Sequence, residues 1–173
     1  MTMSRRELSK SLLGLAAASS ATFDTACPLR GKFDNILRYV PVALIAFDRV
    51  VSIAQDSGAD LSQLQNVIAR VKAALADIQT AILEFREHDG DTLRQAILTA
   101  LTIAHQRLTE FASAIADKLS ANTALAVRAL LEVIISTLNG FQSQISRGSG
   151  SVPTLAAFRR DFNAKLPDHK YDI

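Results

Sequence analysis

Apolar side chains recur every three or four residues over three long stretches of the chain, from Leu61 to Phe85, from Leu93 to Leu119 and from Ala124 to Ile145. This spacing lines one face of an α-helix, and its persistence over several heptads is typical of helices that pack side by side. The apolar positions are Leu61, Leu64, Ile68, Val71, Leu75, Ile78, Ile82 and Phe85, then Leu93, Ile97, Leu101, Ala104, Leu108, Phe111, Ile115 and Leu119, then Ala124, Val127, Leu131, Ile134, Leu138, Phe141 and Ile145. The pattern predicts three long amphipathic helices.

A fourth apolar stretch, nearer the N-terminus, is less regular. It comprises Phe33, Leu37, Val40, Leu44, Phe47, Val51 and Ala54, and Pro41 lies inside it. Proline lacks a backbone donor and its ring clashes with the preceding turn. We therefore expect either a kink at this point or a helix that starts near Val40.

Short polar segments at 56–59, 88–91 and 120–122 separate the four stretches. Short connections favour antiparallel neighbours, so the sequence predicts an all-α fold with an elongated, antiparallel, up-down-up-down four-helix bundle over residues 27–147. Residues 148–173 are predicted to form a Gly/Ser linker, a short fifth C-terminal helix that Pro167 ends, and a polar tail from Asp168. One face of the short helix would carry Val152, Leu155, Phe158, Phe162 and Leu166.

Residues 1–26 have the pattern of a cleavable signal peptide. A basic beginning is followed by a modestly hydrophobic stretch of Leu, Ala, Ser and Gly, and then by small residues suited to cleavage. The segment Ser4-Arg5-Arg6-Glu7-Leu8-Ser9-Lys10 resembles the twin-arginine motif S-R-R-x-F-L-K, with Leu8 in place of Phe and Ser9 in place of Leu. The resemblance implies export through the twin-arginine pathway, which carries folded proteins, with Arg5 and Arg6 as the recognised pair. An ordinary secretory signal and an amphipathic N-terminal helix are the alternatives.

Cys27 is a candidate for lipidation. A lipoprotein signal places a small residue directly before an acylated cysteine, and Thr25-Ala26 meets that requirement, although Asp24 stands where Leu is usual. The alternative is a free cysteine without a special role. The expected location is therefore the periplasm or the extracellular space, with a lipid anchor if Cys27 is acylated.

The composition limits the classes of partner. The 19 basic and 17 acidic residues nearly balance, whereas a nucleic-acid surface needs a concentrated basic stripe. We therefore expect no nucleic-acid partner. No uninterrupted apolar run reaches the roughly 18 residues that a membrane-spanning helix needs.

The residue sets that give helical bundles their chemistry are missing from the sequence. Di-iron bundles need two Glu-x-x-His pairs, and haem attachment needs Cys-x-x-Cys-His, but the chain has one cysteine and three histidines. His105 adjoins an apolar face, where a packing role is the simpler interpretation. We expect no enzymatic activity, no catalytic residue, no metal site and no cofactor.

The stretch from Ala124 to Ile145 is apolar around most of its circumference, because Leu130, Val133 and Ile135 lie outside its main seam. These three residues are a candidate interaction surface. The sequence therefore favours a non-enzymatic exported bundle that acts by protein–protein association or structural scaffolding, as a homo-oligomer or with a protein partner. The alternatives are a carrier that holds an apolar small molecule or lipid near Leu44, Phe47, Leu131 and Ile134, and a membrane-active helical bundle.

Overall fold

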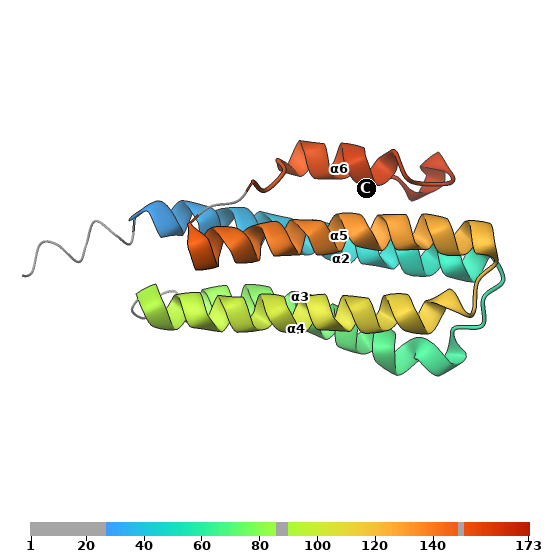
Figure 1. Ribbon diagram of the computed structural model, residues 1–173, viewed down its shortest axis with the longest axis horizontal. Helices are drawn as coiled ribbons and strands as arrows, with labels where there is room; N and C mark the ends of the chain where they lie inside the picture. Colours follow the sequence, from blue (N-terminus) through green and yellow to red (C-terminus); the bar gives the residue numbers. More distant parts are fainter. Residues whose placement is uncertain (1–26, 86–89, 149–150) are drawn as a thin grey trace, which may run out of the picture. The chain divides into compact units, whose positions relative to one another are not determined.

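The computed structural model describes residues 27–85, 90–148 and 151–173. Within these ranges it contains α-helices, two short 3-10 helices and no strand, which confirms the all-α prediction. The predicted signal peptide lies outside the described residues. The five α-helices are α2 (Cys27–Asp56), α3 (Gln65–Phe85), α4 (Gly90–Ala116), α5 (Ala121–Arg147) and α6 (Leu155–Asn163), and the 3-10 helices are Ser62–Leu64 and His169–Tyr171 (Figure 1).

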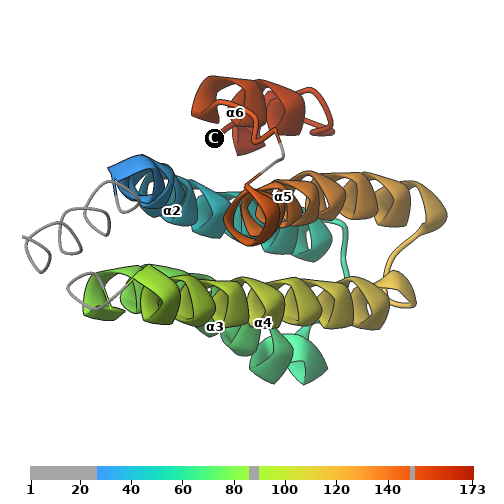
Figure 2. The same ribbon diagram turned by 60° about the vertical axis from the view of Figure 1, so that its left-hand side comes forward.

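The chain divides between Asp34 and Asn35 into two units. In the second unit, α2 and α5 lie side by side, α3 and α4 form a second pair, and α6 lies against α5 (Figures 1 and 2). Edge-to-face aromatic pairs cross the interior, with ring centroids 5.0 Å apart for Tyr39 and Phe141 and for Phe47 and Phe111. The ammonium of Lys72 lies 2.5 Å from the carboxylate of Asp48 and joins α3 to α2 at the surface.

The apolar seams of α3 and α4 are confirmed. Every predicted position from Leu61 to Ile82 and from Leu93 to Ile115 is buried. Leu119 lies beyond the end of α4 and is half-buried, and the side chain of Phe85 is outside the described part. Asp60 accepts a hydrogen bond from the backbone N–H of Ser62 at 2.9 Å, so its carboxylate satisfies a free donor where the helical segment begins.

Of the two alternatives for the first long helix, the start near Val40 is wrong, because α2 already begins at Cys27 and includes Pro41. A kink at Pro41 stays a prediction. Pro41 is exposed. The carbonyl that loses its partner belongs to Leu37, one turn earlier on the same face. Beyond the predicted seam, α2 also buries Ile36, Tyr39, Val42, Ala43, Ala46, Val50 and Ile53. This helix is therefore enclosed over more of its circumference than one seam can describe.

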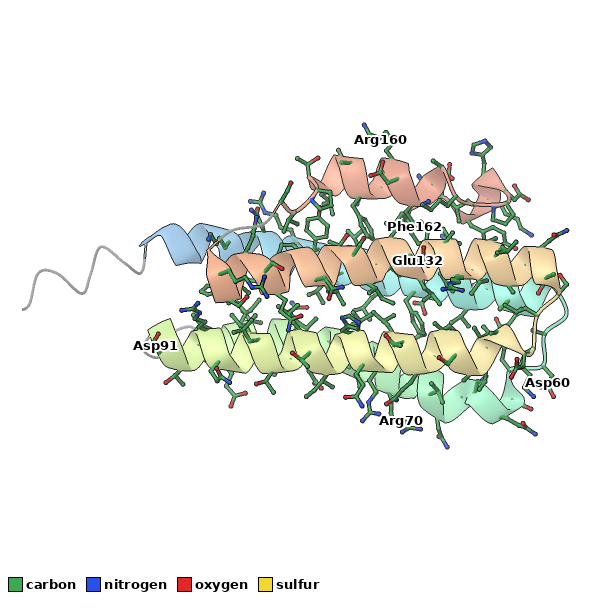
Figure 3. The ribbon with its side chains drawn as sticks, in the orientation of Figure 1. Asp60, Arg70, Asp91, Glu132, Arg160 and Phe162 are labelled. Atoms are coloured by element: carbon green, nitrogen blue, oxygen red, sulfur yellow. The ribbon has the colours of Figure 1, made fainter. Side chains whose placement is uncertain are left out.

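The predicted fifth helix is present as α6. The Thr154 hydroxyl accepts a hydrogen bond from the N–H of Ala157 and caps its start. Phe158 and Phe162 are fully buried, and Phe162 points toward α5 while Arg160 points away (Figure 3). The residues after the helix do not form a purely polar tail, because Tyr171 is buried.

Helix α5 begins at Ala121, inside the segment 120–122 that was predicted as a connection, and ends at Gly148 as expected, where a φ of 68° forms a left-handed cap. Gly140 permits a close crossing. A Cβ atom built there would lie 3.2 Å from the backbone oxygen of Ser151 and 3.3 Å from a methyl group of Val152. The chain that leads to α6 therefore passes over α5 at a position without a side chain.

Candidate functional site: an apolar groove between α4 and α5

A groove of about 710 Å³ runs between the C-terminal part of α4 and the N-terminal part of α5. We call it the α4–α5 groove. Its lining is mainly apolar and consists of Thr109, Ala112, Ser113, Ile115, Ala116, Leu119, Ala121, Ala124, Leu125, Val127, Arg128, Leu131, Glu132 and Ile135. A volume of this size is in the range of known ligand sites, but the groove is open to solvent along the helices.

The local sequence explains why the two helices leave a groove here. Four small side chains line it where α4 ends and α5 begins: Ala112, Ala116, Ala121 and Ala124. Alanine fills too little space to close the gap between two helix surfaces, although the leucine and isoleucine of the seam pack beneath it. Farther along the same helix pair, polar groups join α4 to α5. His105 Nδ1 lies 2.7 Å from Asn139 Oδ1, and the amide of Gln142 donates to the Thr102 hydroxyl at 3.1 Å.

Leu125 is the most exposed large apolar side chain in the described residues, with 68% of its surface accessible. It lies on the groove together with the half-buried Leu119 and Ile135. Burying a leucine side chain stabilises a complex by roughly 1.5–3 kcal/mol. A single exposed leucine needs no explanation, but one that continues an apolar groove is a candidate contact.

The two charged residues that line the groove form an ion pair. Arg128 Nε lies 3.3 Å from Glu132 Oε1, one helical turn apart on α5, and both side chains are well exposed. A second pair on α4 lies outside the groove lining: Arg107 donates to Glu110 at 2.7 Å, and this hydrogen bond lowers the pKa of the Glu110 carboxyl. The groove therefore offers apolar surface with a balanced ion pair on α5. Figure 3 labels Glu132 on this helix.

Two other spaces fit a ligand less well. A groove of about 640 Å³ between α3 and α4 is lined mostly by small or polar side chains, among them Asp77, Thr80 and Thr99. The space enclosed near Tyr39, Leu75 and Phe158 measures only about 10 Å³, which is barely enough for one water molecule. The interior at that point is filled by side chains.

The structure separates the three residues of the predicted interaction surface. Leu130 is completely buried, so it belongs to the core. Val133 and Ile135 are half-buried, and of the three only Ile135 lines the α4–α5 groove. The mixed exposure of these residues shows that the apolar circumference of α5 serves both the core and an accessible face.

The other site predictions lie at or beyond the edge of the described part. Arg5 and Arg6 are outside the described residues. Cys27 is the first residue of α2, and its side chain is outside the described part. In the ranges that the structure describes, no three side chains of His, Cys, Asp or Glu gather as a metal site would require.

Sequence reasoning missed two features. Leu125 is one of the apolar residues of α5 and was not singled out, although no residue of the seam lies three or four positions from it. Tyr171 donates to the carboxylate of Asp56 at 2.5 Å, across 115 positions of sequence. The only signal for this contact is an aromatic residue within an otherwise polar segment.

By length and composition alone, α5 is apolar enough to cross a membrane. The core helix of a soluble protein meets the same test. In α5, seven apolar side chains are buried in the bundle: Val127, Leu130, Leu131, Ile134, Leu138, Phe141 and Ile145.

Comparisons of the chain with protein-family models, with curated proteins and with solved structures found no match.

Proposed function

We propose that this protein is an exported, non-enzymatic helical bundle that acts by protein–protein association or as a structural scaffold. The surface that a protein partner covers is the α4–α5 groove. One observation carries the proposal: Leu125, 68% exposed, extends the apolar lining of a groove of about 710 Å³ on the surface of the bundle.

The shape and chemistry of the groove favour a helical partner. Two neighbouring helices with small residues between them leave a channel into which the side chains of a third helix can pack. The Arg128–Glu132 pair lies at the side of this channel, as polar rims surround the apolar centres of protein interfaces. Because these two charges already engage each other, they are better suited to orient a partner than to transfer a proton.

The proposal includes the up-down-up-down arrangement of the four long helices. Hydrogen bonds between α4 and α5 support an antiparallel arrangement of these two helices, because residues with higher numbers on α4 bond residues with lower numbers on α5. Arg94 bonds the Ser146 carbonyl, Thr102 bonds Gln142, and His105 bonds Asn139. The connections between successive long helices are also short, as antiparallel neighbours allow.

Export depends on residues 1–26, and the proposal places the bundle in the periplasm or the extracellular space. Arg5 and Arg6 are the residues that a twin-arginine pathway would recognise. If Cys27 is acylated, a lipid anchor would attach at the first turn of α2 and hold the bundle close to a membrane.

The alternative function is the carriage of an apolar small molecule or lipid. The filled interior near Tyr39 and Phe158 argues against a ligand at that point, because ligand pockets usually measure several hundred cubic ångströms. A carried ligand would therefore occupy the α4–α5 groove as well. A membrane-active bundle is the third candidate and rests on the apolar composition of α5.

Photo-crosslinking tests the proposal. A photoreactive benzophenone amino acid replaces Leu125 in one variant and Leu83 in a control, since Leu83 is exposed on α3 away from the groove. Both variants are irradiated in cells, and the adducts are identified by mass spectrometry. We expect a protein adduct from position 125 and none from position 83. A lipid adduct from position 125 would support the carrier, and the absence of any specific adduct there would contradict the proposal.

A further inference from the structure

The α5 side of the groove carries four residues in one line: Leu125, Arg128, Glu132 and Ile135. We call this line the α5 ridge. Leu125 is 68% exposed, and the side chains of Arg128 and Glu132 are 77% and 66% exposed. The spacings of three, four and three residues keep all four on one face of the helix.

The order of these residues is symmetric about position 130. Reading along the ridge gives an apolar, a basic, an acidic and an apolar residue. If a second α5 helix is laid against this ridge in the opposite direction, with the two helices level at position 130, Leu125 meets Ile135 and Arg128 meets Glu132. The same two contacts repeat on the other side of the two-fold axis, as an isologous interface requires.

From this symmetry we infer that the partner of the α4–α5 groove is a second copy of this chain, which docks with α5 antiparallel to α5. The inference rests on the proposed function and names its partner. Spacings of three and four are those of the paired positions in antiparallel helix pairs, so the ridge can act as a short helix–helix seam. The neighbouring groove receives the side chains of the incoming helix.

The ion pair makes a second copy a better occupant than a lipid. Within one chain, Arg128 and Glu132 contact each other at 3.3 Å in an exposed pair, which contributes little to the stability of the monomer. In the symmetric arrangement each charge gains a partner from the other chain. A lipid tail on the same ridge would cover the two charges without offering either of them a partner, which opposes binding.

Charge exchange tests the inference on the purified full-length chain by sedimentation velocity. Arg128→Glu makes both charges of the ridge negative, and Glu132→Arg makes both of them positive. Each single variant places like charges opposite each other twice, so we expect each to weaken dimerisation by at least about tenfold. An equimolar mixture of the two should form a heterodimer, and the double variant Arg128→Glu/Glu132→Arg should recover the homodimer.

Leu125→Ser should also weaken the dimer, whereas Leu83→Ser on α3 should not, although both replace an exposed leucine. Circular dichroism melting identifies any variant that fails to fold, and the recovery by charge exchange does not depend on a loss of function. A wild-type monomer, or a dimer that both charge reversals leave unchanged, would overturn the inference. A crosslink from position 125 to a different protein would then still support the proposed function. The lack of any adduct at position 125 would contradict both the proposed function and the homodimer.

Discussion

The carboxylate of Asp56, at the C-terminal end of α2, holds the last residues of the chain. It accepts a hydrogen bond from the Tyr171 hydroxyl at 2.5 Å and one from the Lys170 ammonium at 3.1 Å. The bond from Tyr171, followed by that from Lys170, lowers the pKa of Asp56 below its ordinary value of 3.8. The pKa of Lys170 is raised, chiefly by its hydrogen bond with Tyr171 and then by that with Asp56. The attachment of the C-terminal segment therefore depends on an ionised Asp56.

Acid should release this segment. The pKa of Asp56 in the folded protein lies below 3.8. The stabilisation that its ionised carboxylate gives to the C-terminal segment is therefore complete above about pH 3.8 and is lost as the pH falls through the folded pKa. We expect the hydrogen-exchange protection of residues 170–173 to decrease below about pH 3.8. In Tyr171→Phe, which keeps the buried ring, protection should be lower and its pH dependence smaller.

Asp77→Asn is the control, since it removes an exposed carboxylate on α3 and should leave the transition unchanged. Equal pH dependence in the wild type and in Tyr171→Phe would show that the hydrogen bond to Asp56 does not hold the segment.

Burial at single positions was predictable where a helix presents one seam to its neighbours, as α3 and α4 do. The spacing also separates Leu130, which is buried, from Leu125, which is exposed. Leu130 lies three residues after Val127 and four before Ile134, whereas no seam residue lies three or four positions from Leu125. The interpretation of the sequence placed Leu130 outside the seam and so missed this difference. Tyr171 was missed because a six-residue segment is too short for a periodic pattern.

Among the helices, α6 has the clearest structural role. Phe158 packs against Tyr39 of α2, with ring centroids 5.6 Å apart, and stacks with Phe162 at 6.1 Å. The Tyr39 hydroxyl donates a hydrogen bond to the carbonyl of Pro153, just before α6, and burial raises its pKa to about 12. Helix α6 thus covers an apolar and aromatic part of α2 and α5.

Phe158→Ala should destabilise the domain by about 3–5 kcal/mol, the range measured when a buried phenylalanine is truncated. The reason is the loss of ring contacts with Tyr39 and the cavity left beneath α6. The matched control is Arg160→Ala, on the exposed face of the same helix, which should change stability by no more than about 0.5 kcal/mol. Chemical denaturation measures both. Similar losses for the two variants would mean that α6 does not cover the core.

Element boundaries show where sequence patterns are reliable. Gly148 ends α5 where expected, because a left-handed cap favours glycine. Pro41 does not mark the start of α2, since a proline removes only one intrahelical hydrogen bond and the extensive burial of α2 can outweigh that cost. The role of Gly140 was not foreseen, because it concerns the crossing of a distant segment.

At the scale of the whole molecule, bulky side chains fill the interior of the bundle. Phe47, Phe111, Phe141, Phe158 and Phe162 are all fully buried, so the α4–α5 groove at the surface is where a partner or a carried ligand would bind. The groove was foreseen only in general terms, as an excess of apolar residues on α5. Its position depends on where small residues of α4 and α5 meet, which the single sequence does not specify.

The proposed export route makes a prediction about the folded state of the bundle. The resemblance of residues 4–10 implies a twin-arginine pathway. Such pathways carry folded proteins, whereas an ordinary secretory route threads an unfolded chain. Arg5→Lys together with Arg6→Lys should leave the protein in the cytoplasm, because these two arginines are the pair that a twin-arginine pathway recognises.

Ile78→Asp should also leave the protein in the cytoplasm, for a different reason. Ile78 is completely buried, and an unpaired carboxylate there costs several kcal/mol, a large part of the roughly 5–15 kcal/mol that stabilises a domain. Thr80→Asp, on the exposed face of α3, is the control and should be exported normally. Fractionation of cells, with immunodetection of the precursor and the exported form, measures all three. Normal export of the double lysine variant would assign the signal to the ordinary secretory class. Normal export of Ile78→Asp, if circular dichroism shows that the purified variant is unfolded, would mean that the pathway does not require a folded bundle.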